Sequence, residues 1–163
     1  MRVVVTGAAG FIGSRLAEMV LERAEELDLD ELVILDALTY SGRRENLASV
    51  LADPRVRFVE GSITDARVTD EALAGAAVVL HLAAESHVDR SIDGARVFVE
   101  TNVVGTQQLL ESARRAGVSR FVHVSTDEVY GSIEVGAWRE DHVLEPNSPY
   151  SSSKAGSDLA ALA

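Results

Sequence analysis

The sequence of 163 residues contains no cysteine and few of the features that would set it apart from an ordinary globular domain. Without cysteine, a disulfide framework and a thiolate metal site are both excluded, and a cytoplasmic protein is the simplest interpretation. No apolar run approaches eighteen residues, so no transmembrane helix is expected. The chain opens directly into the apolar run of residues 2–6 rather than into a signal-peptide pattern.

Positive charge is also scarce, with 15 Lys and Arg residues against 26 Asp and Glu and a net charge of −11. Nucleic acid is therefore not an expected partner, because phosphate backbones select for basic patches. Nucleotides stay compatible with this charge, since backbone N–H groups and a helix dipole can hold their phosphates. No metal site is predicted. His81 and His123 fall in strand-like runs that suit hydrogen-bonded core histidines, and Trp138 and His142 fall in a surface loop.

Short aliphatic runs alternate with helical patterns along the chain, as in an α/β protein with a doubly wound parallel sheet (a Rossmann fold). Helical spacing is recognisable over residues 16–27 and 102–116, the second ending at Gly117. Residues 150–163 form a further helical block with no strand after it, so we expect an N-terminal piece of a longer protein. The expected strands are residues 3–5, 32–35, 56–59, 77–82 and 121–124.

A glycine-rich turn joins the first expected strand to the first helix, with Gly7, Gly10 and Gly13 in the spacing Gly-x-x-Gly-x-x-Gly. The first glycine permits a tight turn, the second lets a pyrophosphate approach the backbone, and the third allows helix and strand to pack closely. The pyrophosphate would lie at the positive end of the helix that begins at Phe11 and Ile12. The alternative is an ordinary glycine-rich turn.

An acidic residue, Asp36, closes the second expected strand. A carboxylate at this place accepts the ribose hydroxyls of an adenosine and repels a 2′-phosphate, which favours NAD over NADP. A plain strand-end turn is the alternative. The nearby Arg43 and Arg44 leave the choice of cofactor open.

Tyr150 and Lys154 are one helical turn apart in the last helical block. A lysine ammonium on the same face stabilises a phenolate and so lets the tyrosine act as a base near neutral pH. Thr126, Asp127 and Glu128 directly follow the fifth strand, where ligands of doubly wound sheets bind. One carboxyl could act as an acid and the other as a base. A surface Tyr–Lys pair and a solvated acidic turn are the corresponding alternatives.

These motifs together resemble the extended short-chain dehydrogenases, and within them the nucleotide-sugar 4,6-dehydratases. The Asp-Glu pair after Thr126 separates this branch from the epimerases, and residues 84–91 point to its thymidine-linked members, whose substrate is dTDP-glucose. The resemblance covers essentially the whole chain. It rests on residues 6–13, 38–40, 81–91, 101–106, 125–131 and 146–154.

The resemblance implies a reaction and a role for each catalytic residue. Tyr150, assisted by Lys154, would take the proton of the sugar 4-hydroxyl as hydride leaves C4 for NAD, and Thr126 would bind the same oxygen. Glu128 would then remove the C5 proton while Asp127 protonates the departing 6-hydroxyl. Return of hydride to C6 would give the 4-keto-6-deoxy sugar.

The resemblance also assigns binding residues and an assembly. Ser62, Ile63 and Ala83 would lie beside the cofactor, and Ser86 and His87 beside the substrate. Ser62 replaces an aspartate that usually contacts the adenine amino group in this family, so adenine binding would be weaker. A homodimer would form through helices near 102–116 and 150–163. Residues 1–163 would be the NAD-binding domain with the catalytic residues, without the C-terminal substrate-binding region.

Two other functions stay open at this point. A C4 epimerase or simple sugar dehydrogenase would keep the redox step and lose the elimination. A cofactor-binding piece without turnover is the third candidate, because 163 residues would lack the substrate-binding region.

Overall fold

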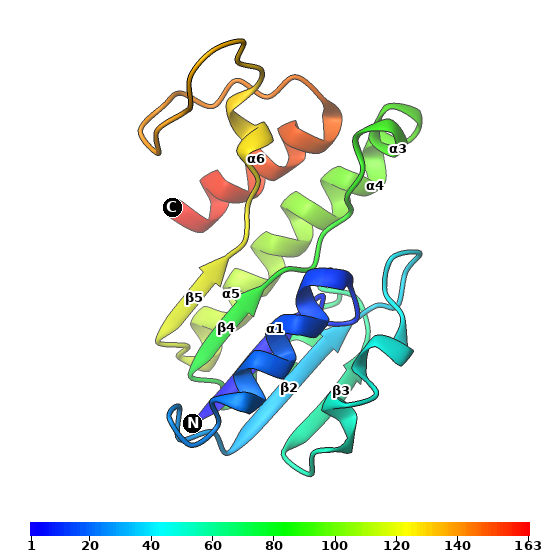
Figure 1. Cartoon of the computed structure of the whole chain (residues 1–163), viewed down its shortest axis with the longest axis vertical. Coiled ribbons are helices and arrows are strands. Elements are labelled where there is room, and N and C mark those ends of the chain that lie inside the picture. The colour runs from blue at the N-terminus through cyan, green and yellow to red at the C-terminus, as the bar shows by residue number, and fades with distance from the viewer. The chain divides into compact units, whose positions relative to one another are not determined.

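A computed structural model describes all 163 residues, Met1–Ala163. It contains a five-stranded parallel sheet with the strand order β3-β2-β1-β4-β5 (Figure 1). This order, with helices between the strands, confirms the predicted α/β Rossmann fold. The strands are β1 (Arg2–Thr6), β2 (Glu31–Asp36), β3 (Val56–Glu60), β4 (Val78–His81) and β5 (Arg120–His123).

The chain divides into two compact units. The sheet unit comprises residues 1–83 and 108–124, and the helical unit comprises residues 84–107 and 125–163. The sheet unit holds the five strands, α1 (Phe11–Glu22), the short 3-10 helices Arg44–Leu47 and Val50–Ala52, α2 (Ala66–Leu73) and most of α5 (Thr106–Ala116). The helical unit holds α3 (Val88–Asp93), α4 (Ala95–Phe98), the π-helical stretch η3 (Val99–Gly105), the 3-10 turn η4 (Asp127–Tyr130) and α6 (Pro149–Leu162).

Two apolar clusters cover the two faces of the sheet. Val5 of β1 joins the cluster that contains Ala17 of α1, whereas the next residue back, Val4, joins the cluster with Leu73 of α2 and Leu109 of α5. Neighbouring side chains of a strand point to opposite faces, so a strand buried on both faces must be apolar throughout. This explains why β1 and β2 have continuous runs of Val, Leu and Ile.

The fifth strand differs from its prediction as a buried strand. β5 pairs only with β4, and its Val122 and the following Val124 are 41% and 39% exposed. An edge strand lacks a neighbour on one side, which leaves its side chains more accessible.

Two predicted helix boundaries were wrong. The helix expected from residue 102 begins at Ala95 and passes through π-helical residues 99–105 before α5. The helix expected to reach residue 27 ends at Glu22, although Ala24 and Leu27 still pack on the core from the turn that follows. The helical spacing of apolar residues over this stretch therefore indicated which residues pack on the core, but not that they form a helix.

The stop after α5 was predicted correctly. Gly117 has a φ of +71°, a conformation that glycine adopts without strain. Its N–H donates to the Arg114 carbonyl, and the Val118 N–H donates to the Ala113 carbonyl, which together make a Schellman motif.

The short α2 was not predicted; Asp65 caps it by accepting from the Arg67 N–H at 2.8 Å. None of the helices has both the length and the apolar character that crossing a membrane requires.

Candidate functional site

Two glycines of the first turn are required by the backbone itself. Gly7 has a φ of +72°, and a Cβ built on it would lie 2.6 Å from the Ala83 nitrogen. A Cβ on Gly13 would lie 2.2 Å from the Gly7 carbonyl oxygen. Larger residues at either place would force the turn, the start of α1 and the end of β4 apart.

The middle glycine, Gly10, is not required by the backbone as Gly7 and Gly13 are. Its φ of −79° and ψ of 174° are open to any residue, and a Cβ there would meet nothing closer than 3.4 Å. Gly10 is the N-cap of α1, which has neither a side-chain cap nor an acidic residue in its first turn. The N–H groups at Phe11 and Ile12 thus begin a helix whose positive end suits an anion, while their side chains are exposed.

Asp36 lies at the carboxyl end of β2 with only 8% of its surface exposed. Its Oδ2 accepts a hydrogen bond from the Ala9 N–H at 2.8 Å, and its Oδ1 accepts one from the Leu38 N–H at 2.9 Å. Each carboxylate oxygen can accept a second hydrogen bond, so both stay able to receive a ribose hydroxyl.

The two arginines that left the cofactor choice open have other partners in the structure. The Arg44 guanidinium lies 4.5 Å from the centre of the Phe58 ring and 3.9 Å from the Glu60 carboxylate. The Arg43 backbone N–H donates to the Ala9 carbonyl at 3.0 Å. Arg44 thus has a structural function through its side chain, whereas the contact of Arg43 involves its backbone only.

A buried pair, Thr6 and His81, joins the ends of β1 and β4. The Thr6 hydroxyl oxygen accepts from the N–H groups of Leu82 and Ala83 at 3.2 Å each, and it lies 2.7 Å from His81 Nδ1. With both lone pairs used, the hydroxyl must donate its proton to Nδ1, so His81 carries its own proton on Nε2. The expected hydrogen-bonded core histidine is confirmed. The pair holds Ala83 against Gly7, a role that the sequence did not reveal for Thr6.

The residues proposed to border the adenine lie after β3. The Ser62 hydroxyl lies 2.8 Å from that of Thr64 and accepts from the Thr64 N–H at 3.2 Å. Ile63 is 3% exposed and belongs to the apolar core. Only the backbone of Ile63 is therefore available to a ligand.

In the helical unit, Tyr150 lies in the first turn of α6. Ser148 caps this helix through a reciprocal pair of hydrogen bonds with Ser151, both 3.0 Å long, and Pro149 occupies the first helical position. The Tyr150 N–H donates to the hydroxyl of buried Ser91 at 3.0 Å. The tyrosine ring packs edge-on against Phe98 at 6.3 Å between centroids.

Lys154 follows one turn later on α6 and is only 5% exposed. Burial lowers the pKa of its ammonium group, and the Asp158 carboxylate one turn further along partly opposes this by raising it. Asp158 also accepts a hydrogen bond from the Ser125 hydroxyl, at 2.5 Å to Oδ2. This bond attaches the residue before Thr126 to the helix that carries Tyr150 and Lys154.

The acidic pair forms the beginning of the 3-10 turn η4, which contacts α6. The Thr126 hydroxyl accepts from the Glu128 N–H at 3.3 Å and so caps the turn, and Val129 anchors it at 2% exposure. Asp127 is exposed whereas Glu128 is half-buried. The two adjacent carboxyls thus have unequal contact with solvent.

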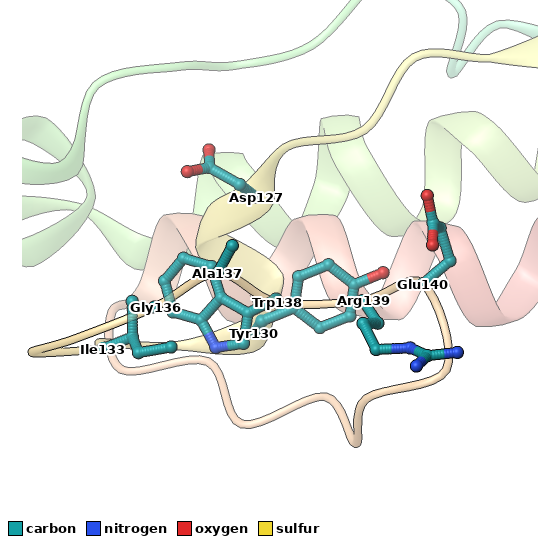
Figure 2. Close-up of a pocket in the computed structure, with 8 residues that line it drawn as sticks. All are labelled: Asp127, Tyr130, Ile133, Gly136, Ala137, Trp138, Arg139 and Glu140. Atoms are coloured by element: carbon teal, nitrogen blue, oxygen red, sulfur yellow. The ribbon is translucent and has the colours of Figure 1, made fainter.

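A hollow of about 350 Å³ lies beside this turn. The Trp138 and Tyr130 rings are stacked, with 6.1 Å between centroids. Figure 2 shows the Asp127 carboxylate pointing away from this pair. Trp138 is half-buried rather than on the surface as predicted, while His142 is exposed as expected. No group of three or more His, Asp or Glu side chains in the chain could hold a metal ion.

The substrate candidates Ser86 and His87 precede α3. Ser86 is half-buried and His87 is exposed. His87 has a φ of +81°, an uncommon conformation for a residue with a side chain, and its carbonyl accepts from the Ser91 N–H. Backbone strain of this kind is concentrated at functional sites.

Asn102 is a site residue that sequence reasoning missed. It is 1% exposed, and its carboxamide both accepts from the Glu85 N–H at 2.8 Å and donates to the Glu85 carbonyl at 3.0 Å. It also donates to Ser153 Oγ at 2.8 Å, which in turn donates to the Tyr150 carbonyl at 2.7 Å. Asn102 thus links the segment before Ser86 to the first turn of α6. The one sequence feature that pointed to Asn102 was its place in residues 101–106, one of the stretches on which the family resemblance rests.

The predicted residues divide between the two units. Those predicted for the cofactor, from Gly7 to Ala83, belong to the sheet unit, except Tyr150 and Lys154. Ser86, His87 and all five predicted catalytic residues belong to the helical unit, which therefore holds the acidic pair, the tyrosine and the lysine together.

Comparison with known proteins assigns a family to this arrangement. A sequence model described as GDP-mannose 4,6 dehydratase matches residues 4–163. The chain belongs to this family. Within it, the chain is dTDP-glucose 4,6-dehydratase-like: it is 57% identical over 161 residues to a Streptomyces griseus dTDP-glucose 4,6-dehydratase, covering 99% of this chain and 48% of that protein.

Solved structures of related proteins support the same family. DesIV, a dTDP-glucose 4,6-dehydratase from Streptomyces venezuelae crystallised with NAD bound, superposes with a TM-score of 0.95 at 60% identity, covering 99% of this chain and 50% of that one. The UDP-glucose 4-epimerase of Thermus thermophilus, also with NAD, gives 0.87 at 34% identity with the same coverage. The chain spans about half the length of the curated relatives it matches.

Proposed function

We propose that this chain provides the NAD-binding and catalytic residues of a dTDP-glucose 4,6-dehydratase, which converts dTDP-D-glucose to dTDP-4-keto-6-deoxy-D-glucose and water. The observation that carries the proposal is the helical unit, where the Thr126–Glu128 turn contacts the helix of Tyr150 and Lys154. The higher identity to dehydratases than to the epimerase supports the same choice. Deoxysugar biosynthesis is the process it would serve.

The sheet unit fits NAD. The open backbone at Gly10, the uncapped start of α1 and the spare acceptor capacity of Asp36 suit a pyrophosphate and an adenosine ribose, respectively. Ser62, Ile63 through its backbone, and Ala83 complete the proposed cofactor contacts. When bound, NAD supplies a hydride acceptor for C4 of the sugar and a hydride donor for C6.

Tyr150 serves as the base for the sugar 4-hydroxyl. An ordinary phenol has a pKa near 10, so a nearby cation is needed to favour the phenolate at neutral pH. Lys154, one turn away on the same helix, supplies that cation when its ammonium is charged. Thr126 binds the same sugar oxygen, and Ser86 and His87 contribute further contacts to the substrate.

Glu128 and Asp127 carry out the elimination. A ketone at C4 makes the C5 hydrogen acidic, and Glu128 removes it. Asp127 gives its proton to the 6-hydroxyl, which leaves as water. The order is fixed, because a carboxylate cannot remove the C5 proton before the neighbouring ketone exists.

Assembly and location belong to the same proposal. Exposed apolar side chains on the helices near 102–116 and 150–163, namely Val104, Leu159 and Leu162 at 55%, 60% and 84%, support a homodimer through these helices. The cytoplasm is the proposed location, and residues 1–163 are proposed to act as one NAD-binding domain.

A product assay tests the function. Incubation of the complete polypeptide with dTDP-glucose in deuterated water should give the 4-keto-6-deoxy product with deuterium at C5, because the proton that Glu128 removes is replaced from solvent. Glu128→Gln should abolish the deuterium and the product, with Glu134→Gln as a control on an exposed carboxylate. A 4-epimer without water loss would instead establish an epimerase.

A second candidate is an NAD-binding piece without turnover, which is favoured by the coverage of about half of each relative. The same product assay distinguishes this binding piece from the dehydratase. NAD binding by isothermal titration calorimetry without any product from dTDP-glucose would support the binding piece and contradict the enzyme.

A further inference from the structure

The loop after β2 is hydrogen-bonded to the phosphate turn at a single residue, Ala9. Ala9 is fully buried. Its N–H donates to Asp36 Oδ2 at 2.8 Å, and its carbonyl accepts from the Arg43 N–H at 3.0 Å and from Asn46 Nδ2 at 2.8 Å. Both backbone polar groups of this one residue are thus held, the N–H by the last residue of β2 and the carbonyl by the loop that follows.

Among these contacts, only Asp36 and Asn46 use their side chains. The Arg43 bond is made by the backbone and would survive a change of side chain, whereas the Asn46 bond would not. Because a carbonyl has two lone pairs, Arg43 and Asn46 together saturate the Ala9 oxygen. Asn46 is itself exposed, so loss of its carboxamide would replace a fixed donor to the Ala9 oxygen with mobile water.

The same loop closes over Asp36 at Gly42. A Cβ on Gly42 would lie 2.8 Å from Asp36 Oδ1 and 3.5 Å from the Ala9 Cβ, so the backbone of Gly42 lies directly against the carboxylate. The Gly42 N–H is bonded to the Thr39 carbonyl within the loop. The Gly42 segment therefore occupies the space on one side of Asp36 Oδ1.

We infer that Asn46 is a positioning residue for dinucleotide selection: through Ala9 it fixes both the Asp36 carboxylate and the Gly42 segment, and so favours a free ribose 2′-hydroxyl over a 2′-phosphate. Two effects act in the same direction. The oriented carboxylate accepts from a 2′-hydroxyl and repels a 2′-phosphate, and the Gly42 backbone lies against that same carboxylate. The inference rests on the proposed binding of NAD and adds a second determinant of the choice between NAD and NADP.

The test compares Asn46→Ala with Ser49→Ala in the complete polypeptide. Ser49 is a suitable control because its hydroxyl bonds Glu18 at 3.0 Å and does not contact Ala9. Dissociation constants for NAD and NADP are measured by calorimetry, with thermal unfolding of the cofactor-free protein as a measure of stability. A net hydrogen bond of ordinary strength corresponds to a roughly 2- to 12-fold change in binding.

Asn46→Ala should raise the dissociation constant for NAD within that range while that for NADP stays equal or falls, so that the preference for NAD decreases. Ser49→Ala should leave both constants unchanged within about twofold, a change below that of one hydrogen bond. An equal loss of NAD and NADP affinity in Asn46→Ala, or no loss, overturns the inference. If the unsubstituted protein binds neither dinucleotide, the proposed function fails instead.

Discussion

The sheet unit and the helical unit are stabilised in different ways. Nearly all the fully buried apolar side chains belong to the sheet unit, whereas the helical unit has three, Phe98, Val129 and Ala155. In their place the helical unit buries eight polar or charged residues. These are Glu85, Ser91, Asn102, Thr106, Ser151, Ser153, Lys154 and Ser157.

The interiors of the two units therefore serve different purposes: one supports the fold, and the other fixes polar residues in place. Apolar burial is non-directional and tolerates exchange of similar side chains, so it builds a stable support. Buried polar groups must find partners of the right geometry, and each partner then fixes a neighbour in place. The unit that holds the proposed catalytic residues is therefore the one whose interior consists mainly of directed hydrogen bonds.

The largest loss of stability is expected in the sheet unit, from Gly13→Ala. The new Cβ would lie 2.2 Å from the Gly7 carbonyl oxygen and 2.7 Å from the Ala8 Cα, both backbone atoms that cannot turn away. We expect the free energy of unfolding to fall by about 3 kcal/mol, measured by urea denaturation. A loss below about 1 kcal/mol would show that the turn is not closely packed on α1.

In the helical unit, Asn102→Ala is expected to have the next largest effect. It removes three hydrogen bonds and leaves the N–H and carbonyl of buried Glu85 unsatisfied, at a cost of about 2 kcal/mol. Hydrogen exchange at the Glu85 amide should become faster by the corresponding factor. Ser153→Ala, which removes one branch of the network, is the matched control and should cost about 1 kcal/mol. Equal losses for the two variants would contradict a central role for Asn102.

Lys154→Met tests the buried charge of the helical unit through pH. Burial lowers the pKa of Lys154, so below its ordinary value near 10.4 there is a window in which the folded chain binds fewer protons than the unfolded chain. The free energy of unfolding should rise with pH across that window. Lys154 is the only lysine of the chain, so the methionine variant should lose this rise.

Urea unfolding at several pH values on the alkaline side of neutrality measures both slopes. An unchanged slope in Lys154→Met would mean that the lysine is not desolvated in the folded protein. The variant should also lose dehydratase activity at every pH, since the cation beside Tyr150 is gone.

Gly10→Ala should have the smallest effect on stability, because its Cβ meets nothing closer than 3.4 Å and its backbone angles suit alanine. We expect the free energy of unfolding to change by less than about 0.5 kcal/mol. Binding of NAD should nevertheless weaken by at least about tenfold, or 1.4 kcal/mol, because the methyl group would occupy the approach of the pyrophosphate. Retained NAD affinity would place the phosphates elsewhere.

The same contrast between the units explains which predictions succeeded. The strands were predictable because burial on both faces requires unbroken apolar runs, as in β1 and β2. The glycine turn and the cap after α5 were predictable because positive φ angles select glycine. The helix from Ala95 was placed too late, and Asn102 received no role, because the signals there are polar and their partners lie far along the chain.

The sequence by itself determined the sheet, its connections and the residue types of both candidate sites, since these depend on local periodicity and on the backbone demands of single positions. The tertiary structure alone decided how those residues are held. It showed that Thr6 supports Ala83, that Asn46 reaches Ala9, and that Asn102 joins Glu85 to α6. Hydrogen bonds between residues far apart in sequence have no local pattern, because their geometry exists only after the chain has folded.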